Sequence, residues 1–192
     1  MAFLALTKKA ASVLNIDIRQ TVVHTFSLPA LEDWVVDIIW PDKSGSTGIL
    51  FYNKATGFAM ALNPAEYTLK YCLTLVMQQL TRFLTEQGLE DKLFYFNELF
   101  SVIHLCRNND PSATGYMTQS KFLVNCWLEE GSEHRVDNSY DLMLRINQNY
   151  RKVKGVFSAS RMDDFLVAIE KITADAGIVM TYTPGDQNQV LH

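Results

Sequence analysis

Two apolar runs separated by a short polar turn are the clearest pattern in this chain. Residues 48–52 and 58–62 are almost entirely apolar, and the turn between them begins with Asn53 and ends with Gly57. Asn and Gly tolerate turn conformations, and the flanking runs are rich in β-branched and aromatic residues, so the pattern predicts a β-hairpin with a loop of about five residues. Because both arms are apolar throughout, we expect other parts of the chain to cover the hairpin on both faces.

Alternation of side chains predicts a third strand just before the hairpin. Over residues 34–40, with the sequence WVVDIIW, every second residue is a large apolar one, which is typical of a strand. The turn-forming residues 41–46 lead directly into the hairpin, so the three strands are predicted to form an antiparallel meander. Further strands are expected at residues 2–6, 101–106 and 178–183.

Helix starts are indicated by capping residues followed by proline. Asn63 precedes Pro64, and Asp110 precedes Pro111, and both pairs are typical of an N-cap and a first helical position. Gly88 is expected to end the helix that begins at Pro64. The other predicted helices are a short one capped by Thr7 and helices over residues 90–99, 112–127, 139–150 and 161–174, the last of them capped by Ser160 with Asp163 three residues on.

Together these elements predict an α+β fold in which helices pack on an antiparallel sheet of about 4–5 strands in two layers. We expect a single domain over residues 1–183, with a helical C-terminal part over about 139–176. Residues 151–160 are predicted to be a basic connection, and residues 184–192 a flexible tail.

Composition narrows the classes of partner. The 192 residues carry a net charge of −4 and a pI near 5.5, which gives no overall attraction to nucleic acid or to an anionic membrane. No apolar run approaches the ~20 residues needed to cross a bilayer, and the N-terminus lacks the pattern of a secretory signal. We therefore expect a cytoplasmic protein without a membrane partner.

The cysteines do not indicate a metal site. Cys72, Cys106 and Cys126 are widely spaced in apolar surroundings, which favours buried thiols over disulfides. No Cys or His pair has the spacing of a zinc site, and we expect neither a metal nor a cofactor.

The strongest polar candidate is a loop between a predicted strand and a helix. Arg107, Asn108 and Asn109 follow the strand 101–106 directly. A cation, two amides and the free N–H groups of a helix start can together hold an anionic ligand such as a nucleotide. The simpler interpretation, which the lack of a glycine-rich loop favours, is that these side chains bond their own backbone.

A second helix start carries Thr7 and Lys8. If the strand 2–6 lies beside the strand 101–106, the two helix starts share one edge of the sheet, and open sheets tend to bind ligands at strand ends. Otherwise Thr7 is a helix cap and Lys8 a solvated side chain.

The only basic concentration lies near the C-terminus. Cations with stacking aromatics are what single-stranded nucleic acid requires. The cations are Arg145, Arg151, Lys152, Lys154 and Arg161, and Tyr150 and Phe157 are interleaved with them. The negative net charge and the shortness of the run favour a solvated loop instead.

One pair of side chains resembles a Cys–His nucleophile. His104 and Cys106 alternate along a predicted strand and so share a face. Such a nucleophile needs a cleft and a third group that orients the base, whereas alternate residues in an apolar strand usually belong to the core. No other catalytic motif is present, so we lean against an enzyme.

Large aromatic residues are numerous for a domain of this size. Protein interfaces are enriched in them, but a dense aromatic core is the simpler explanation. The set comprises Trp34, Trp40, Phe51, Tyr52, Phe58, Phe94, Tyr95, Phe96, Phe100 and Trp127.

Several short segments, taken in order, resemble a small prokaryotic and phage family catalogued as a domain of unknown function. The resemblance covers roughly residues 2–128, departs at Pro111, and is weak over the last ~60 residues. It implies no activity, cofactor or catalytic residue. The matching features are Thr7-Lys8-Lys9, the strand led by Trp34, the hairpin sequence FYNKATGF, Gly88-Leu89, and Arg107-Asn108-Asn109 leading to Gly115-Tyr116-Met117.

Two functions follow as hypotheses. The first is a non-catalytic protein-interaction or regulatory module, phage- or defence-associated, whose partner is another protein or a second copy in a homodimer. The alternative is a binder of a nucleotide or other anionic ligand, or of single-stranded nucleic acid, at the strand-to-helix loops. The aromatic residues and the lack of a catalytic motif favour the first.

Overall fold

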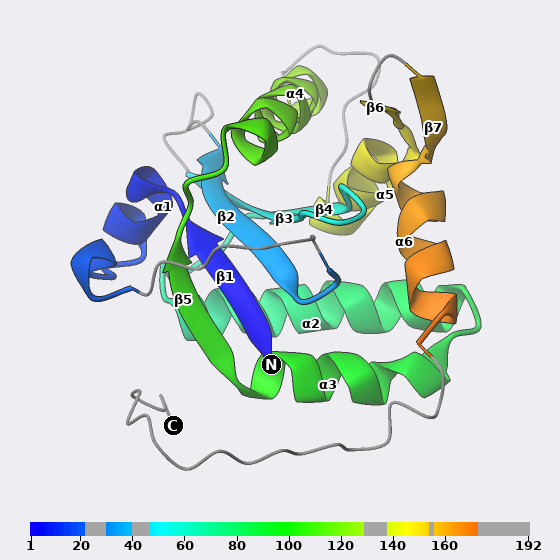
Figure 1. Cartoon of the computed structure of the whole chain (residues 1–192), viewed down its shortest axis with the longest axis horizontal. Coiled ribbons are helices and arrows are strands. Elements are labelled where there is room, and N and C mark those ends of the chain that lie inside the picture. Colours follow the sequence, from blue (N-terminus) through cyan, green and yellow to red (C-terminus); the bar gives the residue numbers. More distant parts are fainter. Residues whose placement is uncertain (22–29, 40–46, 129–137, 154–155, 173–192) are drawn as a thin grey trace.

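A mixed five-stranded sheet forms the centre of the protein (Figure 1). The structure, a computed structural model, describes residues 1–21, 30–39, 47–128, 138–153 and 156–172. In sheet order the strands are β4 (Ala59–Leu62), β3 (Gly48–Asn53), β2 (Asp33–Ile39), β1 (Ala2–Leu6) and β5 (Ile103–Arg107).

The predicted meander is confirmed, but the sheet is not purely antiparallel. β2, β3 and β4 pair antiparallel through the hairpin, whereas β1 runs parallel to both of its neighbours, β2 and β5. Parallel neighbours need a long crossover connection. The chain supplies one between β1 and β2 and another, containing α2 (Leu69–Glu86) and α3 (Leu93–Ser101), before β5.

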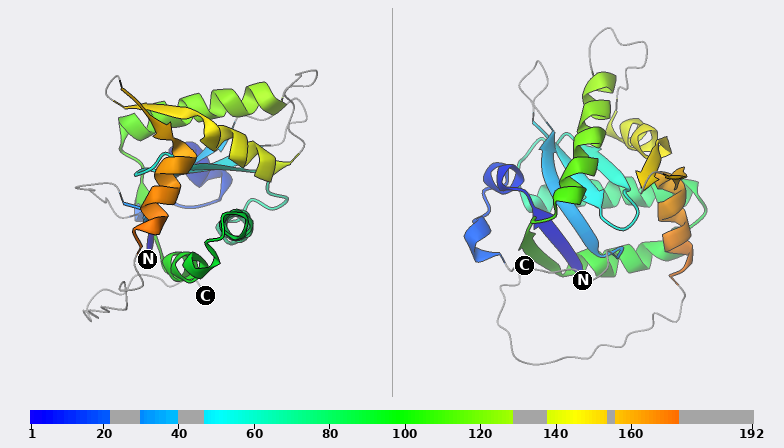
Figure 2. Two further views of the ribbon diagram at one scale, coloured as in Figure 1. Left: turned by 90° about the vertical axis from the view of Figure 1, so that its right-hand side faces the viewer. Right: turned by 45° about the horizontal axis from the view of Figure 1, so that its top comes forward.

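Helices cover both faces of the sheet, so the prediction of two layers is wrong. α2 and α3 pack against one face, and α4 (Pro111–Leu128) and α5 (Ser139–Gln148) against the other, as the edge-on view in Figure 2 shows. The expectation that the apolar hairpin is covered on both faces is confirmed, because β3 and β4 are buried along nearly their whole length. The fold is α+β with three layers.

Most helix starts are confirmed, and one is wrong. The side chain of Thr7 caps α1 (Lys8–Val13), and Ser160 with Asp163 forms a capping box at α6 (Arg161–Glu170). However, α2 begins at Leu69 and not at Pro64, because the hydroxyl of Thr68 accepts the hydrogen bond from the Tyr71 N–H. Two short 3₁₀ helices, η1 (Ile18–Gln20) and η2 (Glu90–Lys92), complete the helical elements of the described residues.

The predicted basic connection over residues 151–160 is wrong as well. Its described residues form two antiparallel strands, β6 (Tyr150–Val153) and β7 (Val156–Ser160), that are separate from the main sheet. The interleaved cations and β-branched residues there fit a strand pair as well as a loop. The predicted strand over 178–183 and the predicted tail over 184–192 lie outside the described residues.

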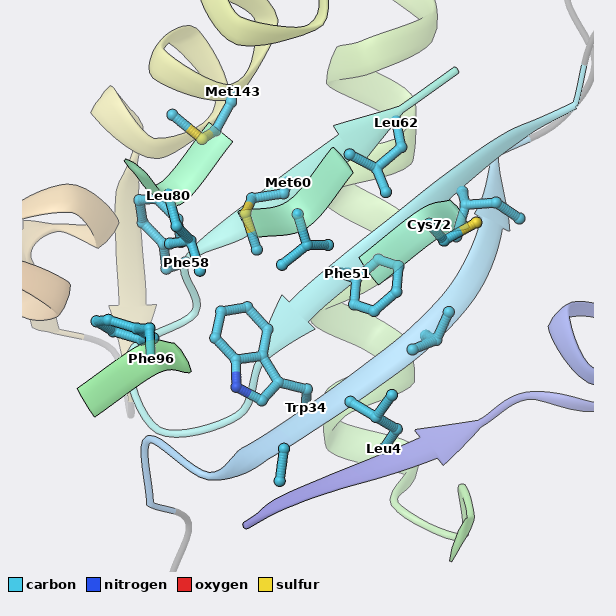
Figure 3. Close-up of a cluster of buried hydrophobic side chains, with 14 of the residues drawn as sticks. Leu4, Trp34, Phe51, Phe58, Met60, Leu62, Cys72, Leu80, Phe96 and Met143 are labelled. Atoms are coloured by element: carbon cyan, nitrogen blue, oxygen red, sulfur yellow. The ribbon is translucent and has the colours of Figure 1, made fainter. Parts of the chain in front are cut away.

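Aromatic residues fill the core on the α2–α3 side (Figure 3). Trp34 and Phe58 come from the sheet side of this core and Phe96 from α3, and all three are completely buried. Of the ten large aromatic residues noted in the sequence, eight have described side chains: five are buried, two are half-buried, and only Phe94 is exposed. The aromatic content therefore belongs mainly to the core.

Candidate functional site

The ends of three parallel strands lie side by side and carry most of the predicted site residues. Leu6 of β1 is paired with Arg107 of β5, and the Asn108 N–H donates to the Leu6 carbonyl over 3.0 Å. Thr7 and Lys8 therefore follow one strand where Arg107 and Asn108 end the next. The sequence predicted a shared edge on the condition that β1 lies beside β5. The structure fulfils this condition.

A buried carboxylate at this edge was missed by the sequence analysis. Asp37, near the end of β2, is 5% exposed, accepts a hydrogen bond from the Thr7 hydroxyl at 2.5 Å, and forms an ion pair with Lys121 of α4. The Ile38 N–H donates to the same carboxylate over 2.8 Å. The signal available in the sequence was a single Asp within an apolar strand. A carboxylate buried there needs a partner.

The loop that follows β5 satisfies its own polar groups. The Asn108 side chain accepts from the Asp110 N–H at 3.1 Å, and the Asp110 carboxylate accepts from the N–H groups of Ser112 and Ala113 at the start of α4. Asp110 also forms an ion pair with Lys54 at 2.9 Å. The N–H groups that an anionic ligand would use at this helix start are thus bound by the protein's own carboxylate.

Lys54 also affects the protonation of Asp110. Burial alone would raise the pKa of the Asp110 carboxyl, but hydrogen bonds from Lys54 and from the backbone of Ala113 and Ser112 hold it below its ordinary value. Asp110 is therefore ionised at neutral pH, and its negative charge is matched by Lys54.

Two cations at the strand ends remain exposed. Lys8 and Arg107 point into solvent, as does the amide of Asn109. Because Asp37 and Asp110 are each matched by a lysine, the exposed part of this edge carries a net positive charge. That charge is the feature available to an anionic ligand.

The predicted nucleic-acid residues belong to a different part of the fold. Arg151 and Lys152 lie in β6, which is not part of the five-stranded sheet, and Lys154 lies outside the described residues. The structure does not bring these residues together with Arg107, and their binding to nucleic acid stays a prediction.

His104 and Cys106 do not form a nucleophile. Burial, and secondarily the negative charge of Asp33, raise the pKa of the Cys106 thiol to about 11, so the thiol is protonated at neutral pH. The His104 ring instead stacks on Phe3, with 5.4 Å between ring centroids. Among the described residues, no group of three or more His, Cys, Asp or Glu side chains is arranged to hold a metal ion.

The outer edge of β5 is a second candidate, which the sequence analysis missed. The Ala2 N–H donates to the Val102 carbonyl and the Asn108 N–H to the Leu6 carbonyl, and backbone groups in a parallel pair alternate in direction. The N–H and C=O groups of His104 and Cys106 therefore point toward β1. Those of Ile103, Leu105 and Arg107 point outward, away from the sheet. We call these outward groups the β5 edge. β1 is the only described strand that pairs with β5.

The opposite edge of the sheet is closed by side chains. The Asn147 side chain of α5 accepts from the Ala59 N–H at 2.8 Å and donates to the Ala59 carbonyl at 2.7 Å, which is the pattern of a neighbouring strand. Gln79 of α2 donates to the Ala61 carbonyl at 3.4 Å. No described side chain does the same at the β5 edge, so the two ends of the sheet differ.

Exposed apolar side chains lie near the start of β5. Val102, directly before β5, is 48% exposed, and Met1, opposite it at the start of β1, is 55% exposed. Phe94, in the first turn of α3, is 64% exposed. Single exposed apolar residues are common, but here two of them adjoin an open strand edge.

The described residues thus form a three-layer α+β domain in which one sheet edge, that of β5, has no partner strand, and they contain no catalytic constellation. The chain belongs to a family of proteins that share a domain of unknown function, DUF6933, whose model matches residues 3–162. The match extends beyond the resemblance seen over residues 2–128 and includes α5, β6 and β7.

Other comparisons do not add to this assignment. The search of curated proteins found no match, and the search of solved structures found none either. Among the helices that the structure describes, none combines the length and the apolar composition that crossing a bilayer requires.

Proposed function

We propose that this domain is a non-catalytic protein-interaction module that binds an extended segment of a protein along the β5 edge. The observation that carries the proposal is the contrast between the two ends of the sheet. Asn147 bonds the N–H and carbonyl of Ala59, and Gln79 bonds the carbonyl of Ala61 in β4, whereas the outward groups of β5 have no partner among the described residues. Proteins normally protect such edges, and an open one is a template for strand addition.

The chemistry of the β5 edge suits an uncharged or acidic strand. Ile103, Leu105 and Arg107 each offer one donor and one acceptor, and main-chain hydrogen bonds of this kind supply affinity without regard to sequence. Selectivity would come from Val102 and Met1, which favour apolar side chains at one end, and from the Arg107 cation, which favours an acidic one at the other.

Selection of linear peptides by display on the immobilised domain tests this proposal. We expect the selected peptides to be rich in β-branched residues and to bind Arg107→Pro about tenfold more weakly than the wild type. Proline removes one outward N–H group, while the exposed position of Arg107 spares the core. Arg107→Ala is the matched control, because it removes the cation but keeps the N–H group. Failure to select any peptide, or equal binding to the proline variant and the wild type, would contradict the proposal.

A second candidate function, binding of a small anionic ligand, is favoured by the exposed Lys8 and Arg107 at neighbouring strand ends. A ligand that binds only the native state raises the melting temperature, so a thermal-shift screen of nucleotides and inorganic phosphate is the direct measurement. We expect any shift to be lost in Arg107→Ala, the variant that removes the cation but keeps the outward N–H group used under the first proposal. A shift that persists in Lys8→Ala with Arg107→Ala would reject an anion site at this edge.

A further inference from the structure

We infer that the partner segment bound at the β5 edge carries a phosphorylated residue at the end that lies beside Arg107. The inference rests on the proposed function, since it names the chemistry of the strand that this edge accepts. It is carried by two exposed cations, Lys8 and Arg107, that lie at one end of the same strand edge.

Lys8 and Arg107 are close in space because of the strand pairing. β1 and β5 are neighbours (Figure 1), and Leu6, two residues before Lys8, is paired with Arg107. Thr7 between them is extended. Neighbouring strands lie about 4.8 Å apart and rise about 3.3 Å per residue, which puts the Cα atoms of Lys8 and Arg107 roughly 8 Å apart. Two long side chains at that separation can reach the same anion.

Both cations belong to the same face of the sheet. Side chains alternate along a strand, so Arg107 points to the side of Ile103 and Leu105, which pack against the core on the α2–α3 side. α1, which begins at Lys8, packs against that core as well through its buried alanines. An anion held between the two cations would therefore sit over this face, at the end of the β5 edge.

The two cations are not matched by acidic groups within the described part of the chain. No described residue forms an ion pair with Lys8 or Arg107, whereas the carboxylates at these strand ends are taken, Asp37 by Lys121 and Asp110 by Lys54. The chain as a whole carries a net charge of −4, so this end of the β5 edge is a local exception. Its charge complements an anionic group on a partner strand.

A phosphate group fits this pair of cations better than a single carboxylate does. It carries a charge of about −1.5 to −2 at neutral pH and three acceptor oxygens, so one group can pair with both cations at once. The guanidinium of Arg107 offers a fork of donors that matches a phosphate bidentately, and the Lys8 ammonium adds a point charge. A carboxylate has one negative charge, which balances only one of the two cations.

The strand edge supplies the second part of the recognition. A free phosphate at two exposed cations binds weakly, because exposed ion pairs contribute little and are screened by salt. A phosphate attached to a paired strand is presented to both cations at a high effective concentration. Val102 and Met1, at the other end of β5, favour apolar side chains there. The partner segment is therefore apolar at one end and phosphorylated at the other.

Fluorescence anisotropy with synthetic peptides tests the inference on the full-length chain. The probes are acetylated and amidated peptides of the alternating sequence Thr-Val-Thr-Val-Thr, with phosphoserine, serine or glutamate added at the N-terminal or the C-terminal end. Blocked termini remove the terminal charges. We expect phosphoserine at one end to strengthen binding about tenfold over serine, and glutamate at the same end no more than about threefold.

The end at which the gain appears gives the direction of the bound strand. A segment antiparallel to β5 begins beside Arg107, whereas a parallel one ends there. The phosphate therefore strengthens binding from one end of the peptide only. An equal gain from both ends would mean unspecific attraction of charge and would overturn the inference, as would an equal gain from glutamate.

Variants of the protein assign the gain to the two cations. The advantage of phosphoserine over serine should vanish in Lys8→Ala with Arg107→Ala and fall to about threefold in Lys8→Ala alone. Arg145→Ala is the matched control, because Arg145 is also exposed but lies on α5, the helix that closes the opposite edge of the sheet through Asn147. It should keep the full gain. A gain that persists in the double variant would reject the inference.

A proline in the peptide separates this result from a failure of the proposed function. Replacing the central threonine by proline removes an N–H group from the peptide and leaves the protein unchanged, and it should weaken all the peptides about tenfold. Serine peptides that bind and are weakened by proline, without any gain from phosphoserine, would reject the inference and leave strand binding intact. Phosphopeptides that tolerate the proline and bind no more tightly than free phosphoserine would reject strand binding itself.

Discussion

Replacing Phe165 with alanine is expected to lower the free energy of unfolding by about 4 kcal/mol, because the ring is completely buried and its removal leaves a large cavity. Phe165 is the point at which α6 enters the core. Its ring stacks on Phe58 with 4.0 Å between centroids and an interplanar angle of 13°. Trp34 meets it edge-on at 6.4 Å, and Phe96 lies 5.9 Å away.

These contacts join three elements that are distant in the chain. Phe58 follows the hairpin turn, Trp34 is the second residue of β2, and Phe96 lies in α3. Because offset and edge-on aromatic pairs contribute beyond the area that they bury, the surroundings cannot recover the loss by a small shift. We expect α6 to loosen, and with it the position of Ile172 beside Lys92.

Urea denaturation followed by circular dichroism measures the loss, and Val167→Ala is the matched control. Val167 lies on the same helix and is 48% exposed, so its truncation should change the free energy of unfolding by no more than about 0.5 kcal/mol. A cost for Phe165→Ala close to that of the control would mean that α6 is not held by this ring.

Capping residues in the sequence correctly predicted a helix start where the side chain accepts from backbone N–H groups of its own helix. Asp110 caps α4 through the N–H groups of Ser112 and Ala113, and the capping box of Ser160 with Asp163 forms as expected. Asn63 and Pro64 carry an equally good local signal but do not start a helix. The Tyr67 hydroxyl, which donates to the Thr47 carbonyl and accepts from the Thr47 N–H, ties that segment to the strand start instead.

Strand order was the part of the fold that the sequence could not supply. Nothing in the residues 2–6 indicates that they separate β2 from β5, because pairing in the middle of a sheet depends on which crossover connections pack well. The error in the predicted sheet followed from this. An antiparallel meander was correctly inferred from β2, β3 and β4, and it was extended to strands whose pairing is not local.

The candidate site was predictable in its residues but not in its partners. Arg107 and Lys8 were identified at helix starts, and the parallel pairing of β1 with β5 brings those starts together. The sequence could not show that Lys54 pairs with Asp110, nor that Asn147 closes the edge at Ala59, 88 residues away. Whether a sheet edge is open depends on which distant side chains bond its backbone groups. The β5 edge could therefore be identified only from the structure.

The second large effect is expected at the ion pair between Asp37 and Lys121. Lys121→Ala should lower the free energy of unfolding by about 3 kcal/mol, because it leaves the Asp37 carboxylate buried without its cation. The side chains of Asp37 and Lys121 are only 7% and 16% exposed. The hydrogen bonds from Thr7 and Ile38 remain, but they do not neutralise the charge.

A double-mutant cycle separates the loss of the pair from the burial of an unpaired charge. An apolar pair, Asp37→Val with Lys121→Met, should be more stable than Lys121→Ala alone, because well-packed apolar residues replace a buried ion pair at little net cost. Urea denaturation of the four proteins of the Asp37→Val and Lys121→Met cycle, with Lys121→Ala beside them, gives the coupling free energy directly. A loss below about 1 kcal/mol in Lys121→Ala, the range of exposed ion pairs, would mean that water reaches the carboxylate at this strand end.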